Sequence, residues 1–408
     1  MSAPPQKARE DYLRLARAMA GEPLPAALVD VAAFDENVAA VLARLDGADV
    51  TLRLATKSLR VPALLRRVAS VGGGRVRGLM TYSARETAWL AGEGFDDLLL
   101  AYPAARPEDA RALADAAARG ARVIAMVDDP VHVELLAHVA AEAGDRLVVG
   151  VDVDVSWRFL GGRVHLGVRR SPVRDPAAAL ALARRARHAG LEVRAVLAYE
   201  AQVAGLPDHT PGSRLLDPAR RLVKRRSSAL AAERREAVVT ALRDDGFDIA
   251  IVNGGGTGSL AATAHDGSCT EVTAGSGFFA PHLFDHYEGL GLRPAALFAV
   301  AVTRSSDPGW VTCGFGGYPA SGAAGADRLP VVHLPEGLEV EPLEGFGEVQ
   351  TPLRVPSGMV PPAIGAPIFC RHAKAGELAE RFGELLLVEG DRVIDRVPTY
   401  RGLGLAFG

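Results

Sequence analysis

Residues 51–57 read Thr51-Leu-Arg-Leu-Ala-Thr-Lys57, a short and mainly apolar run that ends in a lysine. Seven further runs of this kind follow, and stretches able to form helices separate them. Strands that alternate with helices indicate βαβ units and a parallel sheet. Eight such strands favour a closed (β/α)8 barrel over an open doubly wound sheet. The predicted strands are 51–57, 78–82, 97–102, 122–128, 147–154, 192–200, 248–254 and 271–275.

The segments on either side of these strands predict two further parts of this α/β chain. Residues 8–20 carry apolar side chains at helical spacing, so we expect residues 1–25 to form an N-terminal helical segment that packs on the second domain. After about residue 290, Gly, Pro and Val dominate, and short alternating runs are broken by turn residues. This pattern is typical of a mainly antiparallel β-domain. The predicted division is a barrel over 26–290 and a C-terminal β-domain over 291–408.

Composition limits the class of protein and its partners. Hydrophobic residues make up 49% of the chain and charged residues 23%, the balance of an ordinary globular protein. The formal net charge of −3 gives no electrostatic reason to expect nucleic acid or an anionic membrane as a partner. The first ten residues lack the apolar core of a signal peptide, and Cys269, Cys313 and Cys370 are too scattered for a disulfide framework. We therefore expect a cytoplasmic protein without nucleic-acid or membrane partners.

Lys57 is the first candidate for chemistry. The chain has only four lysines, at positions 7, 57, 224 and 374, because arginine carries the remaining positive charge. Lys57 is predicted at the C-terminal end of the first barrel strand, and that end of the strands carries the active site in barrel enzymes. Desolvation at an apolar strand end favours the neutral amine, which can form a Schiff base. The alternative is a lysine that reaches into solvent or pairs with Glu200.

Two glycine-rich turns follow the last two predicted barrel strands. The first reads Asn253-Gly-Gly-Gly-Thr-Gly-Ser259 and the second Ala274-Gly-Ser-Gly277. Consecutive glycines let backbone N–H groups converge, which suits a phosphate dianion, and these loops are the usual phosphate site of such barrels. A plain tight turn is the alternative for either loop alone. Together with Lys57 they predict an amine and a phosphate anchor on one face, which fits pyridoxal phosphate or a sugar phosphate.

Five motifs occur in order along the chain: ATKSLR, AYEAQVAG, NGGGTGS, EVTAGSGFF and PIFCRHAKAGE. Together they resemble the fold-type III pyridoxal-phosphate enzymes, whose barrel is like the N-terminal domain of alanine racemase, and most of all the D-threonine aldolase and D-serine dehydratase branch. The resemblance implies that Lys57 holds the cofactor as a Schiff base and that Tyr199 lies beside it. It also implies a homodimer in which the partner's β-domain closes each active site. The phosphate-binding residues that it implies are Gly255, Gly256, Thr257, Gly275 and Ser276.

Polar residues after the fifth predicted strand complete the barrel part of the site. Asp152 and Asp154 end this strand and are able to face the cofactor ring. Family members carry an arginine in the turn that follows, and His165 or Arg169 takes that place here.

The connection after the sixth predicted strand is long and charged. Residues 217–235 include the run Arg220, Arg221, Lys224, Arg225 and Arg226. Interspersed charges predict a solvated helix face, with a phosphate-binding or interaction patch as the alternative.

The β-domain departs from the family at the metal site. The aldolase and dehydratase branch holds a divalent metal with a His-x-Asp or His-x-Cys pair, whereas this chain reads His372-Ala373-Lys374. An ammonium group repels a cation and offers no lone pair, so we expect no metal. We predict that Lys374 supplies a fixed positive charge at the substrate's β-hydroxyl and that His372 is the general acid or base, both acting on the neighbouring subunit's barrel. The alternative is that the pair only binds Glu377 or caps local structure.

These features predict a pyridoxal-phosphate-dependent lyase that acts at Cα of a small β-hydroxy amino acid, and the resemblance implies a D-substrate. We expect retro-aldol cleavage, because a metal-free site lacks the Lewis acid that would help hydroxide to leave. A D-serine-type dehydratase or deaminase is the alternative. An amino-acid racemase is disfavoured, because TKSLRVPA replaces the racemase motif KANAYGHG around the lysine. Two alternatives come from other functional classes: a protein that binds pyridoxal phosphate without turnover, and a sugar-phosphate aldolase that uses Lys57 without a cofactor.

Overall fold

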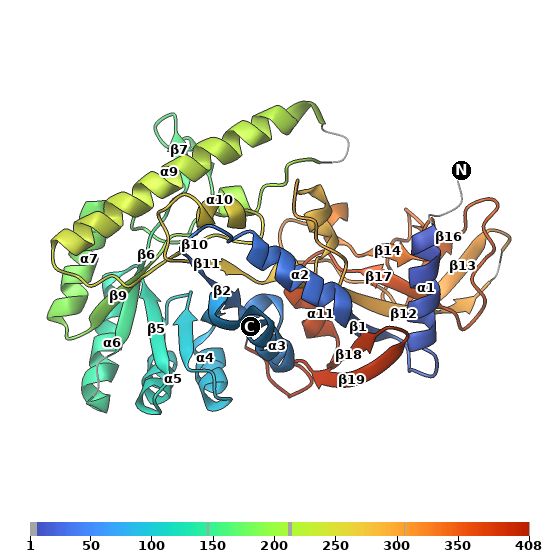
Figure 1. Ribbon diagram of the computed structural model, residues 1–408, viewed down its shortest axis with the longest axis horizontal. Coiled ribbons are helices and arrows are strands. Elements are labelled where there is room, and N and C mark those ends of the chain that lie inside the picture. Colours follow the sequence, from blue (N-terminus) through green and yellow to red (C-terminus); the bar gives the residue numbers. More distant parts are fainter. Residues whose placement is uncertain (1–5, 145–146, 211–213, 306, 408) are drawn as a thin grey trace.

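The computed structural model describes residues 6–144, 147–210, 214–305 and 307–407. Within these residues the chain forms a closed barrel of eight parallel strands and a separate nine-stranded sheet, which lie side by side (Figure 1). The barrel order is β10-β11-β2-β3-β4-β5-β6-β9. The predicted (β/α)8 architecture is therefore confirmed: seven predicted runs contain one barrel strand each, and the run 78–82 overlaps β3, which begins two residues earlier. These strands are β2 (Thr51–Ala55), β3 (Val76–Thr81), β4 (Asp97–Leu100), β5 (Arg122–Val127), β6 (Val148–Asp152), β9 (Glu192–Leu197), β10 (Ile251–Gly254) and β11 (Glu271–Ala274).

Helices follow the barrel strands as the alternation predicts, and one hairpin interrupts the rhythm. The hairpin, β7 (Trp157–Phe159) and β8 (Val164–Leu166), stands between β6 and its helix. None of the described helices is both long enough and apolar enough to cross a membrane. The helices of this half are α2 (Val31–Ala43), α3 (Pro62–Gly72), α4 (Ala84–Gly92), α5 (Pro107–Ala118), α6 (Pro130–Ala143), α7 (Pro176–His188), α8 (Ala201–Ala204), α9 (Asp217–Asp244) and α10 (Leu260–Ala264).

The alternation of side chains along β2 explains how the strand presents Lys57. Leu52 and Leu54 are fully buried in the core outside the barrel. Arg53 points into the barrel, where its guanidinium binds Glu271 with two contacts of 2.6 and 2.9 Å. Because side chains alternate between the two faces of a strand, Ala55 follows on the inner face and Lys57 continues that direction at the mouth.

The second half is built on the nine-stranded sheet, which is mainly antiparallel as the sequence predicts. Its main order is β15-β16-β13-β12-β1-β18-β19, and β17 pairs with both β12 and β14. Only the pairing of β1 with β18 is parallel within this described sheet. The strands are β1 (Ala26–Asp30), β12 (Ala296–Arg304), β13 (Trp310–Gly314), β14 (Val331–Leu334), β15 (Glu339–Val340), β16 (Gln350–Arg354), β17 (Pro367–Arg371), β18 (Glu384–Glu389) and β19 (Arg392–Pro398).

The N-terminal residues differ from the predicted division of the chain. Strand β1 pairs with β12 and β18 in the second sheet, whereas the sequence assigned residues 26–30 to the barrel. The leading helix α1 (Gln6–Ala18) packs on the same sheet, where Leu15 contacts the cluster that contains Leu28 and Phe369. Residues 1–5 of the predicted N-terminal segment lie outside the described residues. The chain therefore begins in the β-domain and enters the barrel through α2.

Candidate active site

A cavity lies at the C-terminal ends of the barrel strands, the end at which the sequence predicts the site. It encloses about 160 Å³. One water molecule needs only about 10–15 Å³ by the same measure, so the cavity has room for a ligand of many atoms. Its wall includes Lys57, Tyr102, Asp152, Arg170, Tyr199, Gly255, Gly256, Thr257, Gly258, Gly275 and Ser276.

Lys57 lies directly after β2, in the short 3-10 turn Thr56–Ser58. Its side chain is exposed at the barrel mouth, as in the alternative of a lysine that reaches into solvent, so the desolvation that the sequence predicts is not found. Nζ donates a hydrogen bond to the phenolic oxygen of Tyr102 at 3.0 Å. The alternative pairing with Glu200 is also wrong, because Glu200 forms its ion pair with Arg235.

Tyr102 follows β4 and lies between two cations. The guanidinium of Arg170 is 5.7 Å from the centroid of the Tyr102 ring and 5.9 Å from that of Tyr199. Burial acts to raise the pKa of Tyr102, but the charge and hydrogen bond of Lys57 and the charge of Arg170 outweigh burial, and the net pKa is lowered. The Tyr102 phenol therefore loses its proton more readily than an ordinary tyrosine, and its oxygen is placed to take one from Lys57.

The two glycine-rich loops meet in the wall of the same cavity. Thr257 Oγ1 accepts a hydrogen bond from the Gly277 N–H at 3.2 Å, which ties the loop after β10 to the loop after β11. The Ser276 hydroxyl lies 3.0 Å from that of Ser58, so the second loop also contacts the turn that carries Lys57. The predicted convergence of the loops at one place is confirmed.

The backbone N–H groups of the first loop fall into two sets. Gly255 N–H donates to Glu200 at 3.2 Å, and Gly256 N–H donates to the Ser259 hydroxyl at 3.1 Å. In contrast, the N–H groups of Thr257 and Gly258 donate to no described residue. Gly255 and Gly256 therefore shape the loop, and the next two residues offer free donors to the cavity.

Glycine is required at two positions of this loop. Gly255 has φ +82°, a backbone conformation that other residues rarely adopt. A Cβ at Gly258 would lie 2.3 Å from the carbonyl oxygen of Ala204 and 2.5 Å from a ring carbon of Tyr287. The loop is thus held closely against α8, which fixes the direction of its free N–H groups.

Asp152, Arg170 and Tyr199 form the wall between the amine and the loops. Burial, with the charge of Asp128 adding to it, raises the pKa of Asp152 to about 7, and Arg170 only partly opposes this shift. Burial also raises the pKa of Tyr199 to about 12. Asp154 is less available because it pairs with Arg158 at 2.9 Å. Neither His165 nor Arg169, the two residues that the sequence offered for this place, lines the cavity, whereas Arg170 does.

His372 and Lys374 do not line the cavity. His372 is completely buried, with its ring edge-on to Phe279 at a centroid distance of 6.2 Å. Burial, with the charge of Arg371 adding to it, lowers the pKa of His372 to about 3, so the imidazole is neutral. The predicted role of His372 as an acid or base on a substrate conflicts with this enclosed position.

Lys374 lies near the mouth of its own barrel. Its Nζ donates hydrogen bonds to the carbonyl and hydroxyl oxygens of Ser321, at 2.6 and 3.2 Å. Burial, then the charges of Arg328 and Lys57, lower its pKa, which places Lys57 close enough to repel it. Helix α11 (Ala375–Arg381) starts directly after Lys374, and a Cβ at Gly376 would lie 1.9 Å from the carbonyl oxygen of Lys57. The segment therefore contacts the Lys57 turn of its own chain, and its action on a neighbouring subunit's barrel stays a prediction.

The donor set does not favour a metal ion. Among the described residues, no group of three or more His, Cys, Asp or Glu side chains is placed to hold one. Lys374 directs its ammonium group at oxygen acceptors, and His372 is shut off from the cavity.

The part of the chain that matches a known family includes all eight barrel strands. Residues 29–281 match the model of the alanine racemase N-terminal domain. The chain belongs to this family. The chain is also similar to a D-threonine aldolase of Arthrobacter sp., with 29% identity over 265 residues. That match covers 64% of this chain and 63% of the relative, so it spans less than two thirds of the relative's length.

Two solved structures extend this alanine racemase-type fold into the β-domain. The D-threonine aldolase from Filomicrobium marinum has a TM-score of 0.78 and 22% identity, and the match covers 93% of this chain and 95% of that one. The D-threo-3-hydroxyaspartate dehydratase from Delftia sp. HT23 has a TM-score of 0.72 and 20% identity, with 94% and 98% covered. The barrel and β-domain therefore form the arrangement seen across this fold.

Sequence reasoning missed Tyr102 and Arg170 in this alanine racemase-type barrel. Tyr102 is the last residue of a run predicted as a strand, so the rule that strand ends carry the site was enough to nominate it. Arg170 is adjacent to the candidate Arg169. Both lie in a loop in which only the structure shows which side chain points into the cavity. A cavity with an amine on one side and free N–H donors on the other fits pyridoxal phosphate, because that group carries both an aldehyde and a phosphate dianion.

Proposed function

We propose that the cavity at the barrel mouth binds pyridoxal 5'-phosphate. The observation that carries this proposal is that the Lys57 side chain and the free N–H groups of Thr257 and Gly258 line one cavity. Lys57 would hold the aldehyde carbon, and Thr257, Gly258, Gly275 and Ser276 would hold the phosphate. Tyr199, one of whose ring carbons approaches Gly256, would form the buried aromatic wall beside the ring. When bound, the cofactor supplies an electron sink for a bond broken at Cα of an amino acid.

The reaction that we propose is the retro-aldol cleavage of a β-hydroxy amino acid, with D-configuration at Cα. The similarity to the D-threonine aldolase of Arthrobacter sp. supports this choice. Arg170 in the cavity wall and Lys374 near the mouth each offer a positive charge to a substrate carboxylate. As a phenolate, Tyr102 is placed to receive a proton from Lys57 Nζ, which leaves Tyr102 as the neutral phenol and Lys57 as the neutral, nucleophilic amine.

Product analysis tests this proposal. Purified protein loaded with pyridoxal phosphate is given D- and L-β-hydroxy amino acids, and glycine, aldehyde, keto acid and ammonia are measured separately. Equal amounts of glycine and aldehyde from the D-substrates are the expected result. Keto acid with ammonia would establish a dehydratase, and inversion at Cα without cleavage would establish a racemase.

The cofactor itself is tested by spectroscopy. The loaded protein should show the visible absorbance band of a Schiff base, which disappears on reduction with borohydride and is absent from Lys57→Ala. The absence of this band from the loaded protein would refute cofactor binding, and a sugar-phosphate aldolase would then be the favoured function. Turnover of an amino acid separates an enzyme from a protein that only binds the cofactor.

We also propose that the reaction needs no divalent metal. By the resemblance, Lys374 matches the position at which family members place a carboxylate or thiolate ligand, and its Nζ already donates to Ser321. Activity should therefore survive dialysis against a chelator. Loss of activity on chelation, with recovery on adding Mn²⁺ or Zn²⁺, would contradict this proposal.

A homodimer remains part of the proposal, because the resemblance implies one. Light scattering of the purified protein measures its mass directly, and a monomer that is fully active would overturn this part alone.

A further inference from the structure

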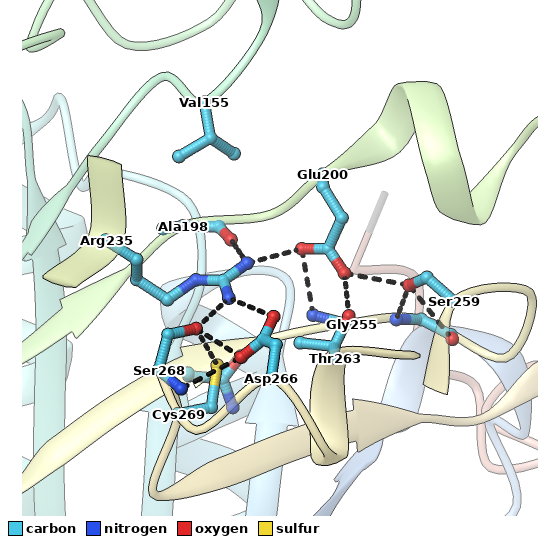
Figure 2. A network of polar contacts seen from close by, with 12 residues as sticks. Val155, Ala198, Glu200, Arg235, Gly255, Ser259, Thr263, Asp266, Ser268 and Cys269 are labelled. Carbon is cyan, nitrogen blue, oxygen red and sulfur yellow. Dashed lines mark hydrogen bonds and ion pairs between the residues drawn. The ribbon is translucent and has the colours of Figure 1, made fainter. Parts of the chain in front are cut away.

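Glu200 follows β9 and lies behind the first glycine-rich loop (Figure 2). One carboxylate oxygen accepts hydrogen bonds from Gly255 N–H at 3.2 Å and from Arg235 at 3.0 Å. The other accepts hydrogen bonds from the hydroxyls of Ser259, at 2.8 Å, and Thr263. Since Ser259 in turn accepts the Gly256 N–H, Glu200 controls both N–H groups that point away from the cavity.

Arg235 completes this network from helix α9. Its guanidinium also donates to the carbonyl oxygen of Ala198 at 3.2 Å, and to Asp266 and Ser268 in the turn before β11 (Figure 2). The side chains of Arg235 and Glu200 are 0% and 1% exposed. Arg235 is the last residue of the segment 217–235, which the sequence predicts to be a solvated helix face. Its burial departs from that prediction, and its side chain makes contacts inside the protein instead.

A carboxylate in this position has two opposite effects on a phosphate. By binding Gly255 and Ser259, Glu200 sets the loop so that the N–H groups of Thr257 and Gly258 remain free for the cavity. As a buried negative charge behind the loop, it would also repel a dianion, and repulsion is strong where water is excluded. Arg235 offsets this repulsion, because its guanidinium pairs with Glu200 at 3.0 Å, although it also pairs with Asp266 at 3.3 Å.

We propose that Glu200 and Arg235 are positioning residues for the phosphate-binding loop: Glu200 fixes the loop, and Arg235 offsets the negative charge of Glu200 that would otherwise repel the phosphate. This inference rests on the proposed cofactor, whose phosphate is the only part that it concerns. The pair should therefore affect the binding of pyridoxal phosphate much more than the binding of pyridoxal, which has the same aldehyde and ring but no phosphate.

The test compares the two ligands in four proteins. Dissociation constants for pyridoxal phosphate and pyridoxal are measured from the visible absorbance of wild type, Arg235→Met, the double variant Arg235→Met/Glu200→Gln, and Arg243→Met. Arg243 lies on the same helix but binds the carbonyl oxygen of Ile249, so it serves as the matched control. Thermal unfolding of each variant shows whether the protein is folded at the temperature of the titration.

Arg235→Met should weaken the binding of pyridoxal phosphate by about 10- to 100-fold, because it leaves the Glu200 carboxylate without its cation. The affinity for pyridoxal should change by about twofold or less, as it should for both ligands in Arg243→Met. The double variant should regain most of the affinity for pyridoxal phosphate, since the neutral amide no longer repels the phosphate. It also keeps the test decisive where Arg235→Met alone does not fold.

Two results would overturn the inference while the cofactor proposal stands. The first is an equal loss of affinity for both ligands in Arg235→Met, which indicates a general structural role. The second is a double variant that binds pyridoxal phosphate no better than Arg235→Met. A wild-type protein that binds neither ligand would overturn the proposed function and this inference together.

Discussion

Replacing Tyr102 by Phe removes the phenolic oxygen that accepts a hydrogen bond from Lys57 Nζ at 3.0 Å. A hydrogen bond to a charged group contributes about 1.5–3 kcal/mol. Because the Lys57 side chain is exposed, water screens the contact, and the lower end of this range applies. About 1.5 kcal/mol corresponds to roughly a tenfold change in rate. We therefore expect Tyr102→Phe to take up pyridoxal phosphate about ten times more slowly than wild type.

The assay is stopped-flow absorbance after mixing apo-protein with pyridoxal phosphate over a range of pH. The charges of Lys57 and Arg170 outweigh burial and lower the pKa of Tyr102, so its phenolate forms at a lower pH than that of a free tyrosine. In wild type the rate should therefore rise with pH earlier than in Tyr102→Phe.

Tyr82→Phe is the matched control for this experiment. Tyr82 follows β3 as Tyr102 follows β4, but its buried hydroxyl bonds to no described residue. Its removal should leave the rate of cofactor capture unchanged. If Tyr102→Phe and Tyr82→Phe both match wild type in rate and in pH profile, the role assigned to Tyr102 is wrong.

Three further changes test the structure under the site. Arg53→Met should lower the free energy of unfolding by about 3–5 kcal/mol in denaturant titrations, because the buried Glu271 carboxylate loses its partner; a loss near zero would contradict this. Burial raises the pKa of Asp152 from 3.8 to about 7, so the folded state keeps a proton that the unfolded state loses between these values. Wild type should thus lose stability relative to Asp152→Asn as the pH rises from about 4 to 7, whereas parallel curves would refute the shift. Gly258→Ala should weaken the binding of pyridoxal phosphate, measured by absorbance titration, because the added Cβ would lie 2.3 Å from the Ala204 carbonyl oxygen. An unchanged affinity would show that the loop can accommodate the Cβ.

The barrel was predictable because its signal is local and repeated. Each strand is a short apolar run with a helix-forming stretch after it, and closure needs only the pairing of β11 with β2. The same local reading failed for β1, because an apolar run of five residues does not specify which sheet it joins. Its partners, β12 and β18, lie more than 250 residues away in the chain.

The site was predictable where backbone geometry decides it and unpredictable where long side chains do. The two glycine loops meet because the ends of neighbouring parallel strands meet. No local pattern shows that Lys374 reaches Ser321, which is 53 positions away, or that Arg235 turns inward while the next residue, Glu236, is exposed. These contacts depend on how α9 and α11 dock on the barrel, which is a property of the whole fold.

Because Gly376 has no side chain, the β-domain packs directly against the backbone of Lys57 at the interface between the two halves. Helix α11 approaches so closely that a single methyl group there would collide with the Lys57 carbonyl. A rotation of the β-domain away from the barrel would therefore remove this contact with the Lys57 backbone. A rotation toward the barrel would push against the same backbone. A substitution far out in the β-sheet that changes its tilt would thus be felt at Lys57 without touching the cavity.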